Sequence, residues 1–140
     1  GALYRGLVDV IEGHLPTEAA VEETVVNRNP LSSLKLGHAR GVVLLAASHA
    51  GLLVNEYAAK QVKRAVTGTG NAAKEQVAVM VRFLLPGCGA VTADAADALA
   101  IAVTHARTLG LRRAMGTTSV IEQAIAAEQA RLRAKAARRT

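Results

Sequence analysis

The chain has 140 residues, of which 51% are hydrophobic and 2% aromatic, and its formal net charge is +6. This length allows one domain with a buried core but not two, and no apolar run approaches the roughly 20 uncharged residues of a membrane helix. The single cysteine, Cys88, excludes an internal disulfide and a cysteine-based zinc cluster, and a reducing cytoplasm is the simplest compartment.

The positive charge is concentrated at one end of the chain. Residues 111–140 carry seven Arg or Lys residues and two acidic ones. A basic terminal segment is typical of proteins that contact a polyanion. It is equally typical of a segment that is disordered or only increases solubility. The composition of residues 118–138 predicts a basic amphipathic helix.

The first 30 residues predict a helix, a strand and a loop. Apolar residues at helical spacing over 2–13 favour an amphipathic helix, which Gly13 ends and Pro16 prevents from resuming. The run over 19–26 is short and rich in β-branched residues, which is typical of a buried strand. The loop over 27–30 follows it.

A long apolar helix is expected next, from a cap at Ser32 or Ser33 to about His49. Gly37 and Gly41 lie four residues apart, so they leave one face of this helix without side chains. Outside a membrane, such a face marks a close helix–helix or helix–sheet contact more often than a catalytic site. The same face could equally serve as a subunit interface.

The second half of the chain is mostly helical. Residues 51–57 predict a second strand, and a turn over 67–71 precedes a helix that Asn71 caps. Helices are expected over 58–66, 72–85 and 93–109, the last ended by Gly110. Helices alternating with strands indicate an α/β fold. Two strands form too small a sheet to carry five helices, so we expect the front of the fold to be missing.

Two carboxylates, Asp94 and Asp97, lie three residues apart at the start of the last of these helices. Positions i and i+3 share one helix face, so the two charges repel unless a cation lies between them. Mg²⁺ prefers such oxygen ligands. The alternative is structural, with Asp94 capping the helix and Asp97 completing a capping box. His105 lies two turns beyond Asp97, too far along the helix to bind the same ion.

Five blocks of sequence carry a family resemblance. They are AVEE at 20–23, LKLGHARG at 34–41, EYAAKQVK at 56–63, GTGNAAKEQV at 68–77 and ADAADALA at 93–100. In this order and at similar spacing, the blocks closely resemble the RuvC family of Holliday junction resolvases. Five blocks in order are a specific signal, whereas any one of them alone is weak.

The resemblance implies an RNase H-like α/β fold for residues 1–110, truncated at the N-terminus, with residues 111–140 as a basic helical extension. It also implies a homodimer that nicks four-way (Holliday) DNA junctions in recombination and repair. The implied cofactor is Mg²⁺, with two ions per site and Mn²⁺ as a substitute. Branch-migration motor proteins are the implied protein partners, and no membrane is involved.

Carried onto this sequence, the resemblance implies catalytic and metal-binding roles for Glu22, Asp94 and Asp97. Lys63 and Lys74 resemble lysines that approach the DNA backbone in this family. From the residues alone, Glu22 and the glutamate after it are equal candidates, because neighbours on a strand point to opposite faces. Composition alone favours a solvated surface position for each lysine.

The helix that carries Leu34, Gly37 and Gly41 resembles the family's dimer helix. Two departures from the family pattern suggest an alternative function. The family's first strand carries an Asp that nothing in residues 1–20 matches, so the chain is expected to begin after that strand. Val25 stands where many members carry a Phe that inserts into the junction, and valine cannot stack on bases. The alternative is a non-catalytic module for junction binding or dimerisation.

Overall fold

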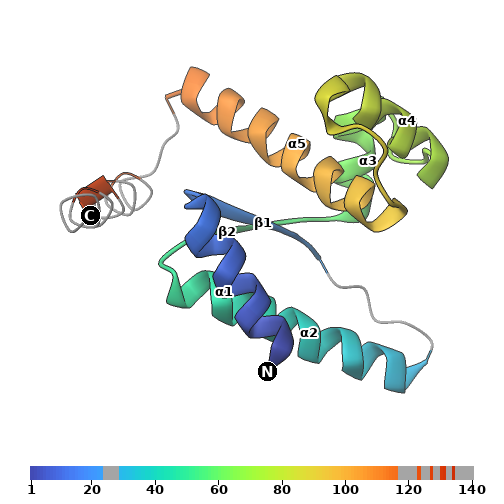
Figure 1. The fold of residues 1–140 in the computed structure, drawn as a ribbon. Coiled ribbons are helices and arrows are strands. Elements are labelled where there is room, and N and C mark those ends of the chain that lie inside the picture. Colours follow the sequence, from blue (N-terminus) through green and yellow to red (C-terminus); the bar gives the residue numbers. More distant parts are fainter. Residues whose placement is uncertain (24–28, 117–122, 124–126, 128–129, 132–133, 135–140) are drawn as a thin grey trace. The chain divides into compact units, whose positions relative to one another are not determined.

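The computed structural model describes residues 1–23 and 29–116, and five single residues after them, 123, 127, 130, 131 and 134 (Figure 1). The elements in chain order are α1 (Ala2–His14), β1 (Glu18–Glu22), α2 (Pro30–His49), β2 (Leu53–Tyr57), α3 (Ala59–Thr67), α4 (Lys74–Leu84), the 3₁₀ turn η1 (Pro86–Cys88) and α5 (Ala93–Ala114). This order of helices and strands confirms the predicted α/β class. No helix among the described residues is both long and apolar enough to span a bilayer.

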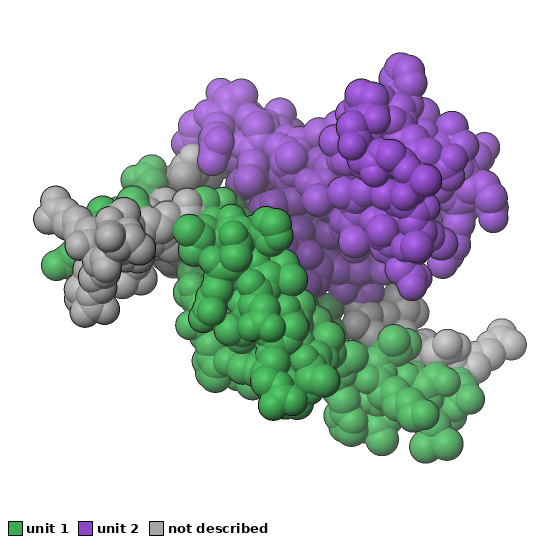
Figure 2. Space-filling view, viewed as in Figure 1, with its two compact units in different colours: residues 1–19, 24–54, 118–140 green, residues 20–23, 55–117 purple. Residues whose placement is uncertain are grey.

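The chain divides into two compact units, which Figure 2 shows in different colours. Unit 1 holds the described residues of the ranges 1–19, 24–54 and 118–140, and unit 2 holds those of 20–23 and 55–117. The predicted division into a domain over 1–110 and a tail over 111–140 stays a prediction.

In unit 1, α1 packs against α2. A hydrogen bond of 2.9 Å between Tyr4 Oη and His49 Nδ1 joins the two helices. The expected end of α1 at Gly13 is wrong, because the helix continues to His14 and Leu15 takes the left-handed conformation with φ 47°. The Leu15 N–H donates to the Ile11 carbonyl and so satisfies one of the last free acceptors of the helix.

The start of α2 also differs from the expectation. Asn29, not Ser32 or Ser33, is the N-cap, and its Oδ1 accepts from the N–H groups of Leu31 and Ser32 at 3.0 and 3.3 Å. Asn is among the best capping residues, and Pro30 follows at a position where its fixed φ suits the first turn. The helix therefore begins earlier than the serines predict.

The strands β1 and β2 pair in a two-stranded sheet. The Glu23 N–H donates to the Tyr57 carbonyl at 2.9 Å, so the carboxyl ends of the two strands lie side by side, as in a parallel pair. The strand β2 begins later than expected because Gly51, with φ 69°, forms a turn with Ser48. The expected strand over 19–26 is confirmed as far as β1 reaches, and residues 24–28, Val25 included, lie outside the described residues.

In unit 2, α3 and α4 pack against each other and against α5. The buried core of this unit consists of Tyr57, Val62, Val66, Ala72, Val77, Val81 and Ala100. Gly68 ends α3 with φ 85°, a conformation that glycine adopts without strain. The expected cap of α4 at Asn71 is wrong. The N-cap is Ala73, whose N–H donates to Gln76 Oε1 at 2.8 Å, while the Asn71 N–H donates to Thr69 Oγ1.

The last described helix, α5, is capped by Thr92, whose Oγ1 accepts from the Ala95 N–H at 3.2 Å. This contact corrects the alternative in which Asp94 is the cap. The expected end at Gly110 is also wrong, because α5 runs through it to Ala114, and Gly116 after it has φ 66°. Most of the helix expected over 118–138 lies outside the described residues.

Candidate functional site

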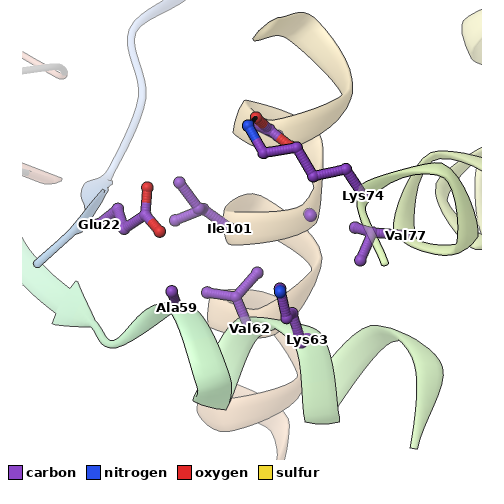
Figure 3. Close-up of a pocket in the computed structure, with 9 residues that line it drawn as sticks. Glu22, Ala59, Val62, Lys63, Lys74, Val77 and Ile101 are labelled. Atoms are coloured by element: carbon purple, nitrogen blue, oxygen red, sulfur yellow. Dashed lines mark ion pairs between the residues drawn. The ribbon is translucent and has the colours of Figure 1, made fainter. Parts of the chain in front are cut away.

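A pocket of about 210 Å³ in unit 2 brings together residues from β1, α3, α4 and α5 (Figure 3). Its lining residues are Glu22, Ala59, Val62, Lys63, Lys74, Val77, Asp97, Ala100 and Ile101. Four of the five side chains expected to bind metal or DNA are among them. These four come from sequence positions as far apart as 22 and 97, so the fold rather than local sequence assembles the pocket.

Secondary structure places each polar group. Glu22 is the last residue of β1, Lys74 is the first residue of α4, and Asp97 lies just after the first turn of α5. Lys63 stands in the middle of α3, one residue after the buried Val62. Strand ends and helix starts are common positions for functional side chains, because the polar group is exposed while the element behind it is packed.

The apolar wall of the pocket belongs to the core of unit 2. Val62, Val77 and Ala100 are 7%, 5% and 1% exposed, and all three are members of the core cluster. The polar groups at the rim are accessible instead: the Lys74 side chain is 79% exposed and the Asp97 side chain 48%. The site therefore combines a rigid base with charged ends that a solute can reach.

Lys74 and Asp97 form an ion pair with 3.7 Å between Nζ and Oδ2. Both side chains are well exposed, so solvent screens the attraction and the pair contributes at most about 1 kcal/mol. A pair this weak opens readily. Lys74 can turn to a phosphate and leave the Asp97 carboxylate to a metal cation.

Asp94 does not line the pocket with these groups. It is exposed in the first turn of α5 and is not among the lining residues of the pocket. In the part of the chain that the structure describes, no group of three or more His, Cys, Asp or Glu side chains is arranged to hold a metal ion. The structure brings Glu22 and Asp97 to one pocket and does not bring Asp94 into it.

The two carboxylates of the pocket nevertheless fit a hard divalent cation. Mg²⁺ is usually held by one or two carboxylates, with water and substrate phosphate as its other ligands. Glu22 and Asp97 supply oxygen donors of this kind, and Lys63 and Lys74 stand in the same pocket, where they can neutralise a phosphate. This donor set suits a cation that is shared with a phosphate group.

The residues of the expected dimer helix lie in unit 1. Leu34 is 56% exposed, and a Cβ added at Gly37 or Gly41 would meet no described atom within 4 Å. The expected close contact of this glycine face within the chain is therefore not found among the described residues. Leu31 and Leu45 on the same helix are also exposed, at 70% and 48%.

No pattern in the sequence indicates the buried polar pair in unit 2. Tyr57 Oη and His105 Nδ1 are 2.7 Å apart, and the two residues are only 3% and 8% exposed. They are separated by 48 positions and share no local pattern. A tyrosine ending an apolar strand and a histidine on an alanine-rich helix are each unremarkable alone, so their pairing emerges only in the fold.

Comparisons with known proteins agree with the resemblance in the sequence. The family model described as crossover junction endodeoxyribonuclease RuvC matches residues 1–105. A protein of that name from Paramagnetospirillum magneticum is 61% identical over 111 residues, which cover 79% of this chain and 67% of the relative. One from Rhodospirillum rubrum is 58% identical over 120 residues, covering 81% and 71%.

Two solved structures are similar to this chain. A structure of Thermus thermophilus RuvC matches with a TM-score of 0.69 and 42% identity, covering 84% of this chain and 69% of that one. T. thermophilus RuvC in complex with a Holliday junction substrate matches with a TM-score of 0.70 and 43% identity, covering 76% and 65%. The predicted RNase H-like fold is confirmed by this likeness, and the chain spans about two thirds of the length of these proteins.

Proposed function

The chain belongs to the RuvC family of crossover junction endodeoxyribonucleases, and on this premise we propose that it is a Mg²⁺-dependent nuclease that nicks four-way DNA junctions. The observation that carries the proposal is the pocket of unit 2, where two carboxylates and two lysines meet over an apolar base. A junction substrate is also supported by the solved relative in complex with one.

The polar groups of the pocket have separate roles in this proposal. Lys63 and Lys74 act as point charges that hold the phosphate of the scissile bond and offset the negative charge that grows on its oxygens. Glu22 and Asp97 are the groups that would hold the divalent cation. When bound, the cation activates the attacking water and stabilises the leaving oxygen.

The role of Asp94 is a proposal of its own. It lies three residues before Asp97 on α5, so the two side chains are neighbours on the helix surface. A second Mg²⁺ bound through Asp94 at the edge of the pocket would give the two-ion arrangement that phosphodiester hydrolysis often uses. Mn²⁺ has similar ligand preferences and is expected to replace Mg²⁺.

The exposed face of α2 supports a homodimer. Leu34 is exposed, and Gly37 and Gly41 leave space for a close approach of a second helix. Two copies would place two pockets on one junction, as symmetric nicking requires. Branch-migration motor proteins as partners and a cytoplasmic location follow from the same function and stay predictions.

A second candidate function is a module that binds junctions without cutting them. It is favoured by the arrangement of acids: among the described side chains, no three acidic groups converge on one metal position. Such a module would bind junction DNA with a steep salt dependence from phosphate contacts and would leave every strand intact.

Cleavage of a synthetic four-way junction in Mg²⁺ tests the proposal. The chain is assayed alone and fused to the part of the Paramagnetospirillum magneticum relative that it does not match, with Asp97→Asn as the variant. Glu75→Gln is the matched control, because Glu75 is an exposed acid on α4 outside the pocket. We expect symmetric nicks that Asp97→Asn abolishes and Glu75→Gln leaves intact. Undiminished cutting by Asp97→Asn would refute the catalytic role, and tight binding without nicks would favour the second candidate.

A further inference from the structure

A buried hydrogen bond in unit 2 joins two residues outside the lining of the pocket. It joins Tyr57 Oη and His105 Nδ1 at 2.7 Å, and the rings are tilted by 60° with centroids 5.8 Å apart. Neither residue lines the pocket. A polar pair inside an apolar core costs stability unless both groups are satisfied, and here each group satisfies the other. The pair is therefore tolerated in the core, and its direction can fix the positions of the elements that carry it.

Tyr57 connects the elements that carry the polar groups of the pocket. Its carbonyl accepts from the Glu23 N–H at 2.9 Å, next to Glu22 at the end of β1. Two residues further along the chain, Ala59 begins α3 and lines the pocket. The backbone of this one residue therefore links the strand of Glu22 to the helix of Lys63.

The Tyr57 side chain extends this connection to α5. Its partner His105 lies one turn beyond Ile101, which lines the pocket, and two turns beyond Asp97. A helix is stiff over two turns, so holding His105 in place also holds the Asp97 end of α5. The hydrogen bond thus couples the position of Asp97 to that of Glu22.

The composition of the core explains why a directional bond is useful here. Apart from Tyr57, the buried cluster of unit 2 consists of Val and Ala residues. Small, smooth side chains fill space but do little to prevent one element from sliding along another. A hydrogen bond weakens steeply away from its preferred distance and angle, so it sets the register of α5 against the strand ends.

We propose that Tyr57 and His105 are positioning residues, whose hydrogen bond holds the Glu22 and Asp97 carboxylates at the separation at which they share one divalent cation. This inference rests on the proposed function, because it assigns that cation to the pocket. It extends the site to two residues that touch neither metal nor DNA.

The test measures the Mn²⁺ affinity of the 140-residue chain, using the electron paramagnetic resonance signal of the free ion. Tyr57→Phe removes the hydroxyl and leaves the ring. Loss of a hydrogen bond made directly to a metal ligand weakens metal binding by about 10- to 100-fold. The Tyr57–His105 bond acts on the ligands only through the backbone, so we expect the low end of this range, an increase of about 10-fold in the Kd for Mn²⁺. Tyr4→Phe is the matched control, because Tyr4 makes a similar bond of 2.9 Å to His49 on the exposed surface of unit 1.

A second pair of variants controls for loss of Mn²⁺ binding that is caused by misfolding. His105→Asn retains a polar group near the position of Nδ1 and is expected to keep most of the Mn²⁺ affinity, whereas His105→Leu loses it. Circular dichroism and thermal unfolding show which variants are folded. If Tyr57→Phe does not fold, the comparison of His105→Asn with His105→Leu decides, and equal affinities in that pair overturn the inference.

The remaining outcomes separate this inference from the proposed function. If folded Tyr57→Phe binds Mn²⁺ as well as the parent while Asp97→Asn binds it poorly, the positioning role is wrong and the metal site stands. If Asp97→Asn and Glu22→Gln both bind Mn²⁺ like the parent, the cation does not bind in the pocket, and both the proposed function and this inference fall.

Discussion

Lys74 Nζ lies 3.7 Å from Asp97 Oδ2, and the two residues belong to different helices, α4 and α5, that pack against each other. The pair places a cation beside a carboxylate that is proposed to bind metal. In the absence of metal, the lysine offsets the charge of this carboxylate at the pocket rim. In the proposed complex with DNA, a phosphate and a metal ion would provide each group with a stronger partner.

This arrangement predicts that Lys74→Ala weakens junction binding with little change in stability. One phosphate contact is lost, so the slope of log Kd against log salt concentration should decrease by about 1. Lys60→Ala is the control, because Lys60 is exposed on α3 and does not line the pocket. Fluorescence anisotropy with a labelled junction at several salt concentrations measures both slopes. An unchanged slope for Lys74→Ala would remove this lysine from the DNA contact.

The core behind the pocket predicts a contrast between two valines of α4. Val81 is 0% exposed and Val79 is 59% exposed on the same helix. Val81→Ala removes two buried carbon groups and should lower the free energy of unfolding by about 2 kcal/mol. Val79→Ala should change it by less than about 0.5 kcal/mol. Urea unfolding followed by circular dichroism measures the difference, and equal effects would contradict the described packing of α4.

The cap of α5 predicts a stability effect at Thr92 next to the proposed metal ligands. Thr92→Ala removes the acceptor of the Ala95 N–H and should cost about 1 kcal/mol of unfolding free energy. Thr92→Ser keeps the hydroxyl and should behave like the parent. Thermal unfolding of the parent, Thr92→Ala and Thr92→Ser compares their stabilities. A loss in Thr92→Ser as large as in Thr92→Ala would mean that the hydroxyl is not the stabilising group.

The sequence predicted the order of elements because apolar spacing and β-branched runs are local signals. Helix ends were harder to predict, because several capping residues stand close together and local energies differ by little. Asn29 competes with Ser32 as a cap, and Gly13 competes with Leu15 as the end of α1. The residue with the strongest local preference for a helix end is therefore not always the one at which the helix begins or ends.

The candidate site was predictable only in part. The family blocks pointed to Glu22 and Asp97, which the fold does bring to one pocket. The exposed position of Asp94 outside the lining and the hydrogen bond between Tyr57 and His105 were not predictable. Both depend on how α5 packs against the strand ends, and no local pattern encodes that packing.

The open glycine face of α2 predicts a change in oligomeric state. Gly41 is exposed on α2, and a Cβ added there would meet no described atom within 4 Å, so the Gly41→Leu monomer should fold as before. In a dimer formed through this face, the added side chain would block close approach of the two helices. Sedimentation equilibrium should show a parent dimer and a variant that is mainly monomer. Val79→Leu, an exposed substitution on α4, is the control and should remain dimeric. A dimer that tolerates Gly41→Leu would place the interface elsewhere.

The course of α5 through Gly110 predicts that Gly110→Ala stabilises the protein. Glycine inside a helix is less favourable than alanine by about 0.5–1 kcal/mol, and a Cβ at this position would meet no described atom within 4 Å. Gly116→Ala should have the opposite effect, because Gly116 has φ 66° and a Cβ there costs about 1–2 kcal/mol. Chemical unfolding of both variants measures whether each substitution raises or lowers the free energy of unfolding. If the helix ended at Gly110 in a left-handed residue, as the sequence alone suggests, Gly110→Ala would be the destabilising variant, so the sign of this one substitution decides where α5 ends.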